Sequence, residues 1–407
     1  MILPVITYAS LVWWHKTFTQ KNIQILSKAQ RRACLGITGA MITTPTAAME
    51  TLLNLPPLHL LVRAEALRGA YRLRVNGEEG SSRVGHSLIF DEISKNKTLS
   101  MITERITKTV CLTKLFKTTI PTRYEWENNS SKVKPNGIVY YTDGSKTTEG
   151  TGCGVYRSNG QGCRISVSLG QKATVLQTEV YAILIAAARL LKENLTKRKI
   201  FIVTDSKAAI AVLNSYEVNS GLVLECTQVL NALGKCNTVT LVWAPGHAGI
   251  AGNQVADELA RVARAKPFIG PEPACGITYN TAKQEIQAKL TKEHCRHWSK
   301  IPGQNHSKIF LETPNGELAA SILQLGRTKI KLATEMVTGH CRLNKHLHNM
   351  GLADSPLCRG CGEEDETPHH VICQCEAYTK ARERLLGNEK IRQEEVTKIR
   401  PIKILDF

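Results

Sequence analysis

The chain contains 407 residues, and its 53 Lys and Arg residues against 35 Asp and Glu residues give a formal net charge of +18. This length predicts two or three domains, and the hydrophobic fraction of 42% excludes a chain that is disordered throughout. The excess of cations favours a polyanionic partner, either nucleic acid or an anionic membrane surface, and residues 1–135 are the most basic part of the chain.

Signals that direct a protein to a membrane or to the secretory pathway are not found in the sequence. No stretch reaches the roughly 18 apolar residues that span a bilayer. The opening segment, Met1–Trp14, lacks a basic leader and a small-residue cleavage site, and we expect it to be buried core. The 13 scattered cysteines are typical of reduced thiols. We therefore expect an intracellular protein of the nucleus or cytoplasm, with no signal peptide, transmembrane segment or membrane partner.

Helical periodicity dominates the beginning of the chain. Apolar residues recur at helical spacing between Ile23 and Ala33, and a proline-rich break stands at Asn54–Pro57. Turn-forming and charged residues leave little to bury over residues 121–135. We therefore predict a helical region over residues 1–120, followed by a linker.

Residues 136–266 show short β-rich runs that alternate with helical stripes. The expected strands are 138–142, 153–156, 164–168, 200–204 and 238–243, and the expected helices are 173–194, 206–215, 221–234 and 253–265. We expect Asn253 to cap the last helix. This order of elements predicts an α/β domain with a mixed five-stranded sheet flanked by helices.

A second boundary follows at residues 265–273, which contain three prolines. Helical patterns return at 277–300 and 317–338, which predicts a helical extension over residues 267–340. Residues 341–407 contain a Cys/His-rich segment and then a charged helix. The N- and C-terminal extensions of the α/β domain are thus expected to be mainly helical.

Four acidic residues of the α/β domain interrupt apolar contexts, where a charge is costly to bury. Asp143 and Asp205 each end a predicted strand. If these strands pair in parallel, both carboxylates project from one sheet edge, where open α/β sheets bind ligands. Glu179 lies beside the apolar stripe of its helix, and Asp257 lies one turn after Asn253, so both could reach that edge.

Four carboxylates at one edge would repel one another unless cations neutralise them. Oxygen ligands select Mg²⁺ or Mn²⁺, and two such ions can activate water and stabilise the leaving oxygen in an attack on phosphorus. Each acid has an ordinary alternative: a strand-end aspartate is usually a turn or helix cap, and Glu179 could be a solvated helix residue. The four together indicate a catalytic metal site.

The segments that carry these acids closely resemble the ribonuclease H family, in order and in spacing. They are Tyr141-Thr-Asp143-Gly-Ser145, Gln177-Thr-Glu179-Val-Tyr181-Ala182, Val203-Thr-Asp205-Ser206 and Trp243-Ala-Pro-Gly-His247 with its continuation to Asp257-Glu-Leu-Ala260. The resemblance covers residues 136–266. It implies a ribonuclease H-like fold and an endonuclease that hydrolyses the RNA strand of RNA:DNA hybrids.

The resemblance also implies a role for each site residue. Asp143 would bridge two Mg²⁺ ions, Asp257 would complete the ion that carries the attacking water, and Glu179 with Asp205 would complete the other. His247 would handle protons or help product release from a mobile loop, since histidine gains and loses a proton near neutral pH. Gln254 stands where the family often has Glu, a departure that leaves all four metal ligands in place.

Residues 1–120 resemble the tail that follows the polymerase core in jockey-like non-LTR retrotransposons. The segments that carry the likeness are Tyr8–Trp13, Gln30–Arg32, Ile37–Ala40, Thr43–Thr46 and Leu55–Leu58. No aspartate pair of a polymerase active site is found in the sequence, so we expect no DNA synthesis. The chain is thus interpreted as a fragment of a retrotransposon polyprotein.

A second possible metal site lies near the C-terminus. Cys358, Cys361, His370 and Cys375 have the residue types and knuckle-like spacing of a tetrahedral Zn²⁺ site. Jockey-like elements often carry such a segment after the ribonuclease H domain. His369 and Cys373 remain rival ligands, and free thiols in an exposed loop remain the alternative to a metal site. The group His294, Cys295 and His297 is expected to pack or to face solvent.

The leading hypothesis is therefore a retrotransposon-derived ribonuclease H whose partners are an RNA:DNA hybrid and the phosphate backbone of nucleic acid. The alternative is a catalytically silent nucleic-acid-binding fragment that uses its basic N-terminal third and its knuckle. A host housekeeping ribonuclease H is a third possibility, which the flanking segments disfavour. The complete set of carboxylates distinguishes the enzyme from the binder.

Overall fold

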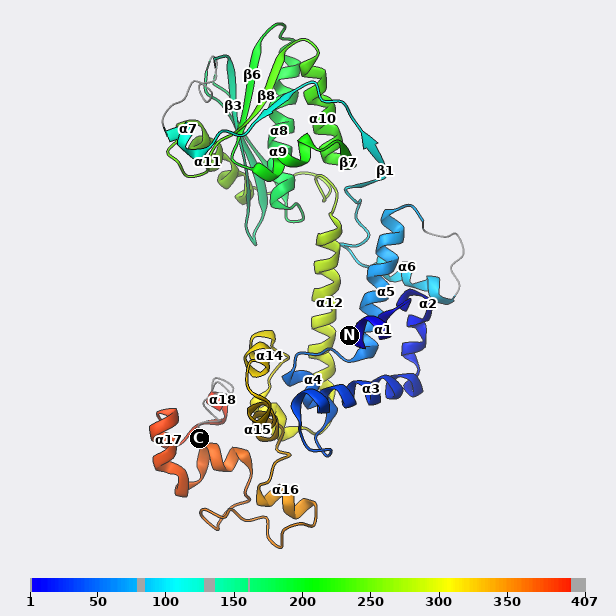
Figure 1. The fold of residues 1–407 in the computed structure, drawn as a ribbon, viewed down its shortest axis with the longest axis vertical. Helices are drawn as coiled ribbons and strands as arrows, with labels where there is room; N and C mark the ends of the chain where they lie inside the picture. The colour runs from blue at the N-terminus through cyan, green and yellow to red at the C-terminus, as the bar shows by residue number, and fades with distance from the viewer. Residues whose placement is uncertain (1, 79–84, 128–135, 160–161, 397–407) are drawn as a thin grey trace. The chain divides into compact units, whose positions relative to one another are not determined.

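The structure is a computed structural model that describes residues 2–78, 85–127, 136–159 and 162–396 (Figure 1). Two compact units make up the chain. The sheet unit consists of Ala70–Ser82 and Phe90–Glu285, and the helical unit consists of Met1–Gly69, Arg83–Ile89 and Ile286–Phe407. Most of the expected linker, residues 128–135, lies outside the described residues, and so does the end of the expected C-terminal helix, residues 397–407.

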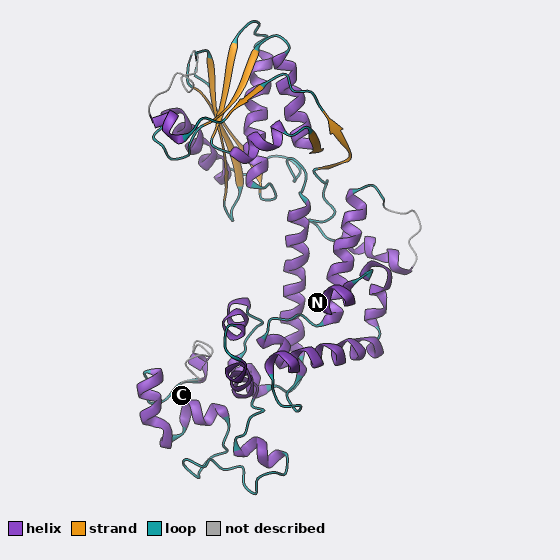
Figure 2. Cartoon of the chain, in the orientation of Figure 1, coloured by secondary structure: helices purple, strands orange, loops and turns teal. Residues whose placement is uncertain are grey.

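The sheet unit contains a mixed six-stranded sheet with helices on both faces (Figure 2). Its strand order is β2-β8-β6-β3-β4-β5, in which β2, β8, β6 and β3 run parallel and β3, β4 and β5 run antiparallel. The strands are β2 (Lys117–Thr119), β3 (Ile138–Lys146), β4 (Thr151–Arg157), β5 (Arg164–Gly170), β6 (Lys199–Thr204) and β8 (Thr238–Trp243). The predicted α/β fold is confirmed.

The sheet has one strand more than the five expected. The additional strand, β2, comes from the region predicted to be a helical tail and pairs with β8 at the edge of the sheet. It is three residues long and has little apolar character of its own, so its extended conformation depends on hydrogen bonds to β8. A separate antiparallel pair joins β1 (Arg105–Cys111) to β7 (Glu217–Ser220).

Helices cover both faces of the sheet because each face carries its own set of apolar side chains. On one face, α8 (Val175–Lys192) and α10 (Gly221–Gly234) pack with the strands around a core that includes Tyr140, Ile202 and Leu241. On the other face, α11 (Ala251–Ala265) lies directly on β4. The close contact needs glycine, since a Cβ on Gly154 would lie 2.1 Å from a backbone oxygen of α11. The remaining helices of the unit are α6 (Ile89–Lys95, whose first residue belongs to the helical unit), α7 (Arg123–Glu127) and α9 (Lys207–Asn214).

The helical unit has its own core, which includes Leu52, Phe310 and the indole of Trp298. Two helices, α5 (Leu58–Val75) and α12 (Tyr279–Lys300), contain the boundaries with the sheet unit. The other elements are α1 (Ile2–Thr7), α2 (Ser10–Trp13), η1 (Trp14–Phe18), α3 (Gln20–Thr38), α4 (Thr46–Leu52), η2 (Gly85–Leu88), α13 (Asn305–Phe310), α14 (Gly316–Leu323), α15 (Arg327–Thr338), α16 (Asn344–Asn349), η3 (His370–Gln374), η4 (Glu376–Tyr378), α17 (Thr379–Leu386) and α18 (Gln393–Val396).

Three sequence expectations outside the sheet can be compared with the structure. The expected helix at 317–338 is two helices, because the chain turns between α14 and α15. The opening segment was expected to be buried, which is wrong for much of it: the side chains of Val5 and Tyr8 are 76% and 80% exposed, whereas Trp14 is buried. None of the described helices is long and apolar enough to cross a membrane.

Candidate active site and Cys/His centre

The pairing of β3 with β6 brings two of the predicted acids together. The strands run parallel, and the last residues in register are Thr142 and Thr204. Asp143 directly follows Thr142, and Asp205 directly follows Thr204, so both carboxylates lie at the same edge of the sheet. The parallel arrangement expected from the sequence is therefore present. The strand β3 itself continues to Lys146 through its pairing with β4.

Helix α8 brings the third acid to this edge. Its N-terminus is fixed by a capping box, in which Thr174 and Gln177 exchange side-chain and backbone hydrogen bonds. The helix passes so close to β3 that a Cβ on Gly144 would lie 2.4 Å from Thr178 Oγ1 and 2.7 Å from the Glu179 nitrogen. Because Gly144 has no side chain, its backbone N–H can donate to the carboxylates of both Asp143 and Glu179.

Asp143, Glu179 and Asp205 form one carboxylate group. Each offers an oxygen, and these three atoms all lie within 4.8 Å of one another. The side chains of Asp143 and Glu179 are each only 6% exposed, and Glu179 Oε2 is buried without a hydrogen-bond partner among the described residues. An unpartnered carboxylate oxygen in such a place is what a cation would satisfy.

Burial and mutual repulsion disturb the ionisation of this group. Burial first, and then the charges of Asp205 and Asp257, raise the pKa of Asp143 to about 8. Burial, followed by the charges of Asp143 and Asp205, raises the pKa of Glu179 to about 9. Without a cation, the raised pKa values of Asp143 and Glu179 favour their protonated forms at neutral pH, and a divalent ion would displace these protons by making the ionised form favourable.

The raised pKa of Glu179 makes a prediction about stability. From its ordinary value of 4.5 up to about 9, the folded metal-free protein binds more protons than the unfolded chain, so its stability falls as pH rises through this window. Glu179→Gln removes the charge, and we expect the variant without Mg²⁺ but with zinc in place to melt about 2–4 °C above the wild type in the same state at neutral pH. Calorimetry across this pH range would measure the difference. A variant that melts lower at every pH, or a wild type whose melting does not depend on pH, would contradict it.

The structure places the other two predicted site residues differently. Asp257 lies on α11, near enough for its charge to act on Asp143, but it is outside the group whose oxygens lie within 4.8 Å of one another. His247 is exposed on the loop between β8 and α11, and its backbone has a positive φ of 54°. The structure thus brings three of the five predicted residues together and leaves Asp257 and His247 at the margin.

Asn253 is a site residue whose role the sequence did not predict. The expectation that it caps the last helix is wrong, because α11 begins at Ala251 and Asn253 lies within its first turn. Its side chain is buried instead, and Nδ2 donates a hydrogen bond of 3.5 Å to Asp205 Oδ2. The contact fixes one oxygen of Asp205. Nothing in the local sequence separates this role from that of a cap, because both use an Asn near a helix start.

Trp243 and Lys207 also border the carboxylate group. Trp243 Nε1 donates to the backbone oxygen of Asp205 at 3.0 Å, which holds the residue in place. Lys207 Nζ lies 4.1 Å from the centre of the Trp243 ring, a cation–π contact. Trp243 is held in turn by Trp126, whose indole N–H donates to the Trp243 carbonyl at 2.9 Å. Lys207 therefore lies two residues after Asp205 in the sequence and against the ring that holds the Asp205 backbone.

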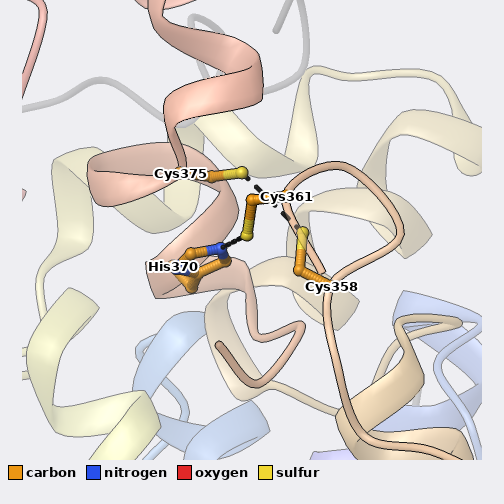
Figure 3. Close-up of side chains that lie close together, drawn as sticks. All are labelled: Cys358, Cys361, His370 and Cys375. Atoms are coloured by element: carbon orange, nitrogen blue, oxygen red, sulfur yellow. Dashed lines mark hydrogen bonds between the residues drawn. The ribbon is translucent and has the colours of Figure 1, made fainter. Parts of the chain in front are cut away.

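The Cys/His segment forms a second compact group, drawn in Figure 3. One ligand atom from each of Cys358, Cys361, His370 and Cys375 lies within 4.8 Å of the others. The Cys358 and Cys375 sulfurs are 3.7 Å apart, and the Cys361 sulfur lies 3.3 Å from His370 Nε2. Four converging soft and imidazole ligands of this kind fit a tetrahedral Zn²⁺ ion.

The surroundings of this group support metal binding. Backbone N–H groups of Glu363 and Glu364 lower the pKa of the Cys361 thiol to about 6, which favours the thiolate that a metal needs. The carboxylate of Glu364 lies 2.9 Å from His370 Nδ1 and can orient the ring so that Nε2 faces the sulfurs. The buried guanidinium of Arg382 donates to the Cys375 carbonyl and fixes the last ligand.

The rival ligands lie elsewhere. Cys373 is completely buried in the hydrophobic core of the helical unit, and burial raises the pKa of its thiol to about 11. His369 is not part of the four-residue group. The backbone here is a π-helical turn, closed by a 2.8 Å hydrogen bond from the Cys375 nitrogen to the His370 oxygen. In the other Cys/His cluster, His294 is buried, as is Trp298 on the same helix, α12.

Comparison with known proteins agrees with the geometry of the acidic group. Residues 135–265 match the family model described as RNase H. A stretch of 212 residues is 26% identical to the retrovirus-related Pol polyprotein from type-1 retrotransposable element R1 of Popillia japonica, and covers 50% of this chain and 79% of that protein. The resemblance predicted from the motifs is thereby confirmed.

Proposed function

We propose that this chain, whose residues 135–265 form a ribonuclease H domain, is an endonuclease that hydrolyses the RNA strand of RNA:DNA hybrids with two divalent metal ions. A domain of this family implies a nucleic-acid substrate. The observation that carries the proposal is the convergence of Asp143, Glu179 and Asp205 at one sheet edge, with a buried carboxylate oxygen that has no protein partner among the described residues. Structural packing gives no reason to gather three acids at one place and to bury two of them.

The donor set fits Mg²⁺, with Mn²⁺ as a possible substitute. Carboxylate oxygens are the ligands that both ions prefer. When bound, two such ions supply the positive charge that activates water and stabilises the leaving oxygen. Asp143, Glu179 and Asp205 would hold these ions, since their oxygens already converge. Asp257 on α11 would complete the ion on its side of Asp143, and His247 on its exposed loop would accept or deliver a proton.

The neighbours of the group would keep it in working geometry. Asn253 holds one oxygen of Asp205, and Trp243 holds its backbone, so the carboxylate has little freedom to turn away. Lys207 would contact a phosphate of the bound strand. Specificity for the hybrid would come from its shape and from contacts to the 2′-hydroxyls of the RNA, with little reading of bases.

The Cys/His centre would have a structural role in the same protein. We propose that Cys358, Cys361, His370 and Cys375 bind one Zn²⁺ ion, because all four converge and His370 has a carboxylate partner on its other nitrogen. The ion would close the loop that carries Arg359, whose guanidinium is anchored by the buried Glu366. With this loop held rigid, the cations near it could contact nucleic acid.

A cleavage assay on the purified full chain tests the enzymatic proposal. Labelled RNA is presented in an RNA:DNA hybrid, as single-stranded RNA and as an RNA duplex, with and without added Mg²⁺. We expect cleavage of the RNA in the hybrid alone, dependent on Mg²⁺, with 3′-hydroxyl and 5′-phosphate ends. Metal-independent cleavage, or equal cleavage of single-stranded RNA, would contradict the proposal. Hybrid binding without any cleavage would support the alternative of a catalytically silent binding fragment.

A further inference from the structure

The outward face of α3 carries a stripe of cations. At 100° per residue, Lys21, Ile25, Lys28 and Arg32 fall within a narrow sector of the helix surface. The buried residues Gln30, Cys34 and Thr38 lie on the opposite side of the helix. All three cations are exposed, and none forms an ion pair within the part of the chain that the structure describes. The helix therefore presents unneutralised positive charge to solvent.

The segment around this stripe contains no acidic residue. Residues 1–49 include Lys16, Lys21, Lys28, Arg31 and Arg32, and the first carboxyl in the sequence is that of Glu50. Glu50 is only 5% exposed, and burial raises its pKa to about 8, so at neutral pH it is mostly uncharged. No carboxylate of the segment itself weakens the field of the stripe. An ordinary solvated helix face carries charges of both signs, so this pattern needs another explanation.

We infer that the stripe Lys21, Lys28 and Arg32 on α3 is a second nucleic-acid contact surface, which binds the phosphate backbone without reading its sequence. Four residues along a helix advance about 6 Å, so Lys28 and Arg32 can contact neighbouring phosphates of one strand while Lys21 reaches further along it. The surface lies in the helical unit and uses none of the acids of the ribonuclease H domain. It would hold the polymer whether or not cleavage occurs.

The pattern of α3 favours nucleic acid over an anionic membrane. A helix that inserts into a membrane surface exposes an apolar face between flanking cations. On α3 the cations occupy the centre of the exposed face, and the single large apolar side chain within the stripe is Ile25, which is 56% exposed. Such a face suits a row of phosphates, since each cation can reach an anion while the helix stays in water.

The test measures binding of fluorescent oligothymidylate to the full chain at increasing salt. This probe contains no RNA, so the result does not depend on the proposed cleavage and survives its failure. The variant Lys21→Gln/Lys28→Gln/Arg32→Gln should bind about tenfold more weakly at moderate salt. Its plot of log affinity against log salt should be shallower by about 2, because each lost phosphate contact removes about 0.7 from the slope for a single strand.

A matched control removes the same charge from another surface. Lys192 at the end of α8 and Arg198 and Lys199 at the start of β6 are exposed, and β6 begins at the opposite end from Asp205. Replacement of these three residues by Gln should leave binding and slope unchanged. Wild-type affinity in the α3 variant, or an equal loss in the control, would overturn the inference. So would unchanged DNA binding together with lost binding to phosphatidylserine vesicles, which would assign the stripe to a membrane. Circular dichroism of each variant verifies that α3 is still folded.

Discussion

Asp205→Asn should reduce cleavage of the hybrid by at least about a thousandfold while leaving hybrid binding nearly intact. The substitution keeps the shape of the side chain and its contact with Asn253, but it removes a charge from a group whose proposed task is to hold two cations. Single-turnover cleavage with labelled hybrid measures the loss, and fluorescence anisotropy without Mg²⁺ measures binding. The two readouts separate a failure of catalysis from a failure to bind.

The matched control for this variant is Glu258→Gln. Glu258 is adjacent in sequence to Asp257, but its side chain is exposed and forms an ion pair with Arg261 on the helix surface. The Glu258→Gln variant loses one negative charge, as Asp205→Asn does, and we expect it to cleave the hybrid at the wild-type rate. If Asp205→Asn cleaves as fast as wild type, the carboxylate group is not catalytic. If both variants lose activity equally, the general loss of negative charge is the cause, and the metal mechanism fails.

The second large effect is expected at the Cys/His centre. The full chain should purify with about one zinc ion, and Cys375→Ala should lose that ion. Because a structural zinc site contributes roughly 10 kcal/mol or more of binding free energy to folding in small domains, the variant should unfold locally around residues 341–396. Elemental analysis measures the zinc, and limited proteolysis detects the exposed segment.

Cys373→Ala provides the control, because both substitutions remove one buried thiol from the same short segment. Cys373 lies in the hydrophobic core, so its loss should cost about 1–2 kcal/mol in packing while zinc is retained. Loss of zinc from Cys373→Ala with retention in Cys375→Ala would transfer the ligand role to Cys373. Zinc-free wild-type protein that resists proteolysis as the loaded protein does would remove the structural role altogether.

The acidic site shows how far the sequence could lead. Asp143 and Asp205 were predictable because each directly follows a β-rich run, and parallel strands bring such positions to one edge. Glu179 was predictable from its place beside an apolar helical stripe. These are local patterns, which a chain displays before it folds. The position of Asp257 near that edge was expected from its place one turn after Asn253, whereas the place of His247 was expected only through family resemblance. The roles of both residues stay predictions.

Other features had no readable local signal. The strand β2 is three residues long and is recognisable only beside β8. Asn253 has the sequence context of a helix cap, and only the packing of α11 turns its amide toward Asp205. For Cys373 and Cys375 the sequence left both as possible ligands, and the π-helical turn places one thiol in the core and the other in the four-residue group.

The amino-acid sequence by itself determined the α/β class of the sheet domain, its main helices and strands, and the identity of the acids, because these depend on periodicity and on charge in apolar surroundings. Only the tertiary structure decided which side chains meet. Contacts between distant segments set the register in which strands pair and the close approach of a helix to a strand at a glycine. They also set the direction in which a turn points its side chains. A one-residue shift in any of them would leave the local patterns unchanged and would separate the same carboxylates and thiols.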